Sequence, residues 1–248
     1  MKLLEDLASK LGLKDPKYLL VIAGGVAAVG VLVLASSKTS GSSKPRKEKL
    51  ALDSKEGLLQ TLQELSNQQA QMRNQLKKLT DEVSGKSMSL SQVCKRCAEM
   101  QLSDPLEKYG MSAVEFNKVL AEYEDDPAVH EAIKTLMGSP PTGTAAVTEA
   151  SSSLTPTKLL DIHKFMLAEY ERLALQPDKG CTKASIITFA AQAIVAGKAE
   201  AAYQVSVEDI ESAVLVHQGA LSSSPEFSEI NVKMQKAIAK LMGIPFSA

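Results

Sequence analysis

The most suggestive chemical spacing in this chain of 248 residues is a pair of cysteines, Cys94 and Cys97, separated by two residues. A thioredoxin-like role requires such a pair to follow a strand at the opening of a helix, and no strand-forming run precedes it. A structural zinc ion would need two further ligands, and the remaining cysteine, Cys181, is far away in the sequence. The spacing therefore favours small side chains buried on one helix. A thiol or metal site built from Cys94, Cys97 and Cys181 is the alternative.

A second short motif, Gly85-Lys86-Ser87, matches the end of a phosphate-binding loop. The complete motif requires a glycine at position 80, which is Thr80 here, and a strand before the loop, where a helix is expected. The sequence therefore does not predict a nucleotide site.

The three histidines, His130, His163 and His217, lie in helical surroundings without a nearby nucleophile and carboxylate spaced as a triad. The acidic residues within 122–126 lack the alternating ligands and central glycine of a calcium loop. This acidic run instead indicates a helix end followed by a solvated cap. No catalytic residue, metal site, cofactor or small-molecule substrate is predicted.

Composition favours an all-α fold. Aromatic residues make up only 4% of the chain and tryptophan is absent, so the core must consist mainly of aliphatic side chains and alanine. The formal net charge of −1 argues against a nucleic-acid surface. Three cysteines cannot form a complete set of disulfides, which is typical of the reducing side of a membrane.

Residues 18–37 contain no charged side chain and are almost wholly apolar. A helix of about 20 residues spans roughly 30 Å, the thickness of the hydrocarbon layer. We therefore expect a transmembrane helix here. Small residues spaced four apart, including Gly24 and Ala28, would let another helix approach closely, so both are candidate partner-binding residues.

Two other interpretations of this apolar stretch stay open. The small residues before Ser36 fit cleavage of a signal peptide, which would make the protein a secreted helical protein. A buried core helix is the other possibility, since three glycines lower the hydrophobicity of the stretch.

Flanking charges indicate the orientation of the span. Four lysines and three acidic residues precede it, whereas five basic residues and only Glu48 follow it up to Lys49. The positive-inside tendency places the large C-terminal part on the cytosolic or an equivalent side, with the basic cluster near the lipid headgroups. In composition, the short anchor and basic flank resemble the signal-anchors of mitochondrial outer-membrane proteins. The resemblance favours a mitochondrial membrane, although an inner-membrane or endoplasmic-reticulum location fits the same composition.

Residues 1–17 form a short segment with leucines at near-helical spacing, and residues 38–56 form a basic tether rich in serine and lysine. Beyond the tether, apolar residues alternate at spacings of four and three through almost four heptads. This seam, interrupted at Gln69, predicts either a coiled-coil partner or the first helix of an ordinary bundle. Its candidate partner-binding residues are Leu58, Leu62, Leu65, Met72, Leu76 and Leu79.

An internal repeat divides the remaining chain. Residues 109–116 resemble 203–210, and residues 131–138 resemble 236–243. We therefore expect a duplicated region of two four-helix repeats, at 57–138 and 157–248, joined by a linker at 139–156 that is rich in proline, serine and threonine.

Helix signals place four helices in each repeat. Serine or aspartate caps, first-turn prolines and terminal glycines mark their ends. The expected ranges are 57–83, 90–102, 113–123 and 127–137 in the first repeat, and 157–175, 182–203, 207–221 and 225–242 in the second.

Together these patterns predict a non-enzymatic, single-pass membrane protein that acts as a helical scaffold, a docking module or an accessory subunit of a larger membrane complex. Its expected partners are the lipid bilayer and other subunits of that complex, bound through helix–helix contacts.

Overall fold

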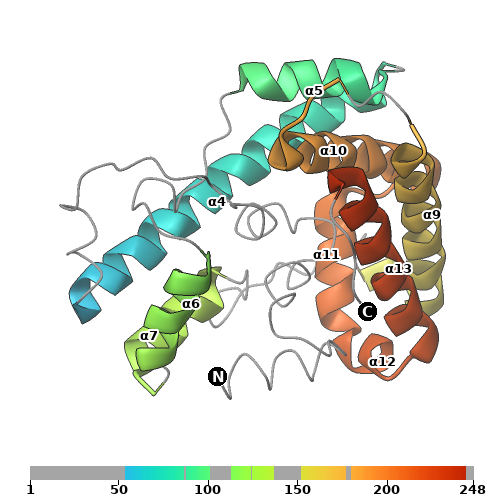
Figure 1. Cartoon of the computed structure of the whole chain (residues 1–248). Coiled ribbons are helices and arrows are strands. Elements are labelled where there is room, and N and C mark those ends of the chain that lie inside the picture. The colour runs from blue at the N-terminus through green and yellow to red at the C-terminus, as the bar shows by residue number, and fades with distance from the viewer. Residues whose placement is uncertain are drawn as a thin grey trace.

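The computed structural model describes residues 54–86, 88–100, 113–123, 125–136, 152–176 and 180–243. Every regular element within these residues is an α-helix (Figure 1). The helices are α4 (Lys55–Ser84), α5 (Leu90–Glu99), α6 (Ala113–Glu122), α7 (Pro127–Leu136), α9 (Pro156–Ala174), α10 (Ala184–Tyr203), α11 (Val207–Val216), α12 (Gln218–Ser222) and α13 (Pro225–Met242).

The all-α fold class predicted from composition is confirmed for this part of the chain. The predicted span at 18–37 lies outside the described residues, together with the N-terminal segment and almost all of the tether. In the described part of the chain, no helix combines the length and the apolar character needed to cross a bilayer.

Local capping explains where several of these helices begin and end. The Ser224 hydroxyl accepts a hydrogen bond from the Phe227 amide at the start of α13, and Gly243 ends that helix with φ +70°. Ser206 is one of the serine caps that the sequence predicts, and it forms a capping box with Asp209 at the start of α11. The corresponding signals at Ser112 and Gly138 lie outside the described residues.

The expected helix at 207–221 differs from the structure, because it is divided at His217 into α11 and α12. His217 adopts φ −98° and ψ 15°, so the helical geometry stops there and restarts. Gly219, two residues after the break, is a weak helix former, so the intrinsic preference for one continuous helix is low at this point.

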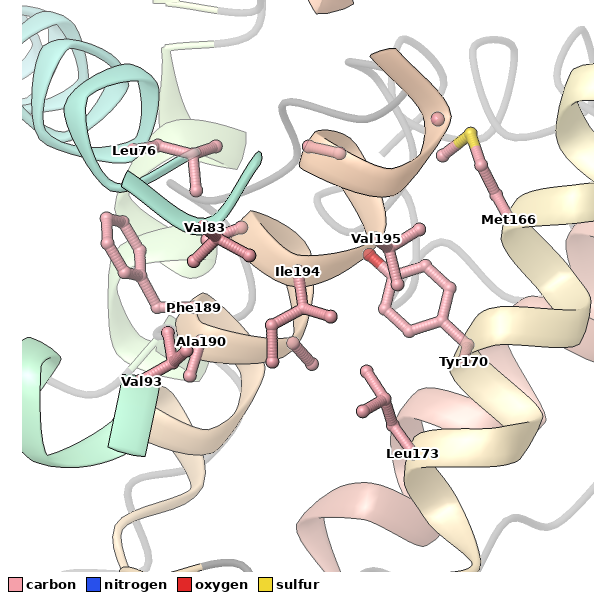
Figure 2. Close-up of a cluster of buried hydrophobic side chains, with 14 of the residues drawn as sticks. Leu76, Val83, Val93, Met166, Tyr170, Leu173, Phe189, Ala190, Ile194 and Val195 are labelled. Carbon is pink, nitrogen blue, oxygen red and sulfur yellow. The ribbon is translucent and has the colours of Figure 1, made fainter. Parts of the chain in front are cut away.

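Helix α10 is the centre of the structure. It packs against α4 and α5 on one side and against α9 and α13 on the other (Figure 1). Its side chains from Ile187 to Gly197 are all buried. Figure 2 shows Val195 beside Tyr170 of α9, whereas Phe189 lies towards Val83 of α4. A helix that is apolar on every face can be accommodated only when neighbours cover it all round.

Small residues allow α4 to approach α10 closely. A Cβ atom placed on Gly197 would lie 2.7 Å from Ser84 Oγ and 3.2 Å from the Thr80 carbonyl oxygen. Five alanines of α10 are also buried: Ala190, Ala191, Ala193, Ala196 and Ala199. The two helices therefore pack with little side chain between their backbones.

A second, smaller cluster lies around the N-terminal half of α4. Leu58, Leu62 and Leu65 pack there with Phe116 of α6 and Val129 of α7. Helix α4, 30 residues long, therefore joins this second cluster to the main cluster around α10 (Figure 1). Because α4 and α5 pack on α10, helices of the first expected repeat contact a helix of the second, on the other side of the linker expected at 139–156.

Candidate functional site

The structure places the heptad seam of α4 inside the chain. Leu58, Leu62 and Leu65 are buried in the second cluster. The C-terminal half of the seam, comprising Met72, Leu76 and Leu79, is buried in the main cluster. Of the two interpretations of the seam, this arrangement is that of a bundle helix, because its apolar side chains contact helices of the same chain. Gly24 and Ala28 lie outside the described residues.

The Cys94 and Cys97 side chains are buried on α5, in the main cluster. Their place on the helix follows from its N-terminal capping box, in which Ser89 and Gln92 exchange hydrogen bonds. Burial raises the pKa of the Cys97 thiol to about 12, and the charge of Cys181 contributes in the same direction. A thiol with so high a pKa is a poor nucleophile at neutral pH towards reagents in solution.

Gly85 belongs to the end of a helix rather than to a phosphate-binding loop. It is the C-cap of α4 with φ −81° and ψ −11°, and its amide donates to the carbonyl oxygens of Asp81 and Val83. Because this amide is used within the chain, it is not available to a phosphate group. Lys86 follows in an exposed position, and Ser87 lies outside the described residues.

His163 is the buried histidine of this structure, with 3% of its surface exposed. Its Nδ1–H donates to the Leu159 carbonyl oxygen at 2.7 Å, and its ring contacts the Phe227 ring edge-on at a centroid distance of 5.0 Å. Burial lowers the pKa of His163, while the hydrogen bond to Leu159 acts in the opposite direction. The neutral imidazole therefore joins α9 to α13 as part of the core.

The acidic run at 122–126 has the capping role expected from the sequence. Asp126 Oδ1 accepts hydrogen bonds from the amides of Ala128 and Val129 in the first turn of α7. Its other oxygen lies 2.6 Å from Lys55 Nζ, which ties the start of α7 to the start of α4. The hydrogen bond from Lys55, opposed by desolvation, holds the pKa of Asp126 below its ordinary value.

Charged pairs connect helices at the surface of the main cluster. Lys77 of α4 pairs with Glu208 of α11 at 2.7 Å, and Lys198 of α10 pairs with Glu169 of α9 at 2.8 Å. Exposed ion pairs of this kind contribute about 0–1 kcal/mol each, so they orient the helices more than they hold them together.

Sequence reasoning missed the exposed apolar side chains. Leu215 is 47% exposed and Val216 is 52% exposed at the end of α11, and Leu175 and Val232 are also exposed. The signal that could have revealed them is the unbroken apolar run at 213–216, which is wider than one buried helix face needs. Leu215 and Val216 are neighbours at the break between α11 and α12, so they form a small apolar surface.

Among the described residues, no group of three or more histidine, cysteine or acidic side chains is placed to hold a metal ion. Comparisons of the chain with protein-family models, curated proteins and solved structures found no match.

The burial of His163 predicts a loss of stability on acidification. Because the pKa of His163 is lowered in the folded chain, below its ordinary value of 6.5 the unfolded chain binds a proton that the folded chain does not. The free energy of unfolding should therefore fall as pH drops below about 6.5, by up to about 1.4 kcal/mol per pH unit from this group.

Urea unfolding of the full chain, followed by helical circular dichroism at several pH values from about 7.5 to about 5.5, measures this loss. The variant His163→Leu should show a shallower loss than the wild type, whereas the control His130→Leu removes a histidine outside the main cluster and should keep the wild-type slope. An identical slope in H163L and the wild type would contradict the assignment.

Proposed function

We propose that the chain is a non-enzymatic, single-pass membrane protein whose helical region is a docking module or accessory subunit of a larger membrane assembly. The observation that carries the proposal is the uncharged apolar stretch at 18–37, followed by a basic flank. In this proposal the two four-helix repeats form the part that faces the cytosol or an equivalent compartment, with a mitochondrial membrane as the favoured location.

The arrangement of the potentially reactive side chains supports a role without catalysis. The cysteines of α5 and His163 are core residues, and Asp126 caps a helix. General acid–base or nucleophilic chemistry needs such groups in contact with one another and with a substrate. These residues instead contribute to packing and to helix ends, which suits a rigid surface for binding.

The mechanism that we propose is positional. The 17 residues between the span and α4, at 38–54, can extend to about 60 Å at most, and as a flexible coil they would average about 20–25 Å. The helical region is thereby confined close to the bilayer. Confinement of this kind raises the effective concentration for a partner in the same membrane, to the millimolar range for a short tether.

We assign partner contact to exposed residues rather than to the seam, because the seam is covered by the chain's own helices. The apolar surface of Leu215 and Val216 is the best-defined candidate in the described part of the chain. An apolar helix of another subunit would cover these side chains and gain roughly 25 cal/mol for each Å² of apolar surface removed from water.

Charges placed in the stretch at 18–37 should abolish membrane integration. An arginine at the centre of a span costs about 2.5–3.5 kcal/mol, so Val26→Arg combined with Val29→Arg should move the full chain from the membrane pellet to the supernatant after alkaline carbonate extraction. The matched control V26L/V29L should stay in the pellet. Release of the wild type itself would contradict the membrane anchor, and a mature N-terminus at Ser36 in mass spectrometry would establish the secreted alternative.

The apolar surface on α11 should affect partner capture without affecting the fold. In native membranes, crosslinking followed by identification of the neighbours should find a reproducible partner for the wild type, and L215Q/V216Q should reduce its yield several-fold because the apolar contact is lost. The control A201Q/A202Q introduces the same two glutamines at adjacent exposed positions of α10 and should leave the yield unchanged. A lone, monomeric wild-type chain would contradict the docking role.

A further inference from the structure

Helix α4 takes part in two hydrophobic clusters that have no buried residue in common. In the described part of the chain the second cluster contains five buried side chains, whereas the main cluster contains twenty-nine. Residues 66–71 of α4 lie between Leu65 of the second cluster and Met72 of the main cluster, and they are serine, asparagine, alanine and three glutamines. None of the side chains described at 66–71 is buried. The apolar packing along α4 is therefore interrupted for more than one helical turn.

Helices α6 and α7 lie beside the N-terminal half of α4, away from α9 and α13 (Figure 1). Among the described residues, α7 packs extensively only against α4. The apolar contact includes Phe116 of α6 and Val129 of α7, which are both buried. An ion pair between Lys55 Nζ and Asp126 Oδ2, at 2.6 Å, joins the same two elements at the surface. We call α6 and α7 together the α6–α7 cover, because they bury the N-terminal half of the seam.

A small cluster of this kind opens more readily than a large one. The hydrophobic free energy of a cluster grows with the apolar area that it removes from water, so five buried side chains contribute far less than twenty-nine. Folded proteins open locally in cooperative units, and the free energy of opening is lowest where buried apolar contacts are few. No buried side chain described at 66–71 couples the two clusters. Loss of the second cluster therefore leaves the packing around α10 in place.

We propose that the α6–α7 cover and the N-terminal half of α4 form a separate cooperative unit, in which the cover leaves α4 while the main cluster stays folded. In the closed chain Leu58, Leu62 and Leu65 are buried. Opening exposes all three, so this half of the seam is an apolar surface only in the open state. The device does not depend on the proposed membrane function, because it follows from packing within the folded chain.

Two matched leucines of α4 test the separation of the clusters. Leu62 belongs to the second cluster and Leu79 to the main cluster, and each is 1% exposed. Hydrogen exchange of the full chain, followed by mass spectrometry of peptic peptides, measures the opening of each helix. L62A should accelerate exchange in α7 by about tenfold or more and leave α10 at its wild-type rate, because a buried methyl-rich side chain is lost only from the second cluster. L79A should accelerate exchange in α10 and leave α7 unchanged.

Coupled behaviour of the two clusters would overturn the proposal. If L62A accelerated exchange in α10 as much as in α7, or if L79A accelerated α7 as much as α10, the two clusters would open as one unit. Complete loss of protection in α7 of L62A, with wild-type exchange in α10, would still support the proposal, because the main cluster would have stayed folded without the cover.

Thiol labelling measures the exposure of the seam itself. L62C and L79C place the same reactive group in the two clusters, and trypsin leaves these positions in peptides 56–73 and 79–86, which contain none of the natural cysteines. Under native conditions iodoacetamide should alkylate L62C at position 62 at least about tenfold faster than it alkylates L79C at position 79, since the cover opens more often than the main cluster. Equal labelling rates at the two positions would contradict the opening of the cover.

Discussion

The structure depends on the burial of α10 on every face between Ile187 and Gly197. No single neighbour can cover this stretch all round, so α4, α5, α9 and α13 must all be in place before it is removed from water. The chain meets this requirement with small residues: the buried alanines and Gly197 let the neighbouring helices approach closely. Dense packing with short side chains leaves little tolerance for added volume.

This constraint also explains where the reactive side chains lie. Residues that could perform chemistry in solution are used to complete the packing around α10, as with Cys97, or to join α9 and α13, as with His163. Their burial changes their chemistry, because it raises the pKa of the thiol and lowers that of the imidazole. Cys181 differs because it is partly exposed at the edge of the same core.

Much of the helical architecture could be predicted from the sequence, because helix ends carry local signals. Ser206 with Asp209, Ser224 with Pro225, and Gly243 each act through neighbouring backbone groups, so a short stretch of sequence contains the information. The break at His217 was missed because the apolar run before it continues the helical pattern. The sequence also could not show which helices pack against the apolar seam of α4, because periodicity indicates that a helix face is buried but not which helix buries it.

The candidate site was harder to predict, because packing between distant segments of the chain leaves no local signal in the sequence. The exposure of Leu215 and Val216 follows from how distant segments pack, and the apolar run at 213–216 shows only that one helix face cannot bury all of its side chains. The central position of α10 was equally hidden: a helix that is apolar all round has no polar face from which its orientation could be inferred.

The most direct test of the central claim compares alanine at two helical glycines. In both variants alanine gains the same intrinsic helix propensity, about 1 kcal/mol. At Gly197, however, the added Cβ meets Ser84 and Thr80 of α4, whereas at Gly219 it meets nothing within 4 Å. If α10 is held by this close approach, urea unfolding should show G197A to be less stable than G219A by at least about 1 kcal/mol. Equal or greater stability of G197A would contradict the packing described for α10.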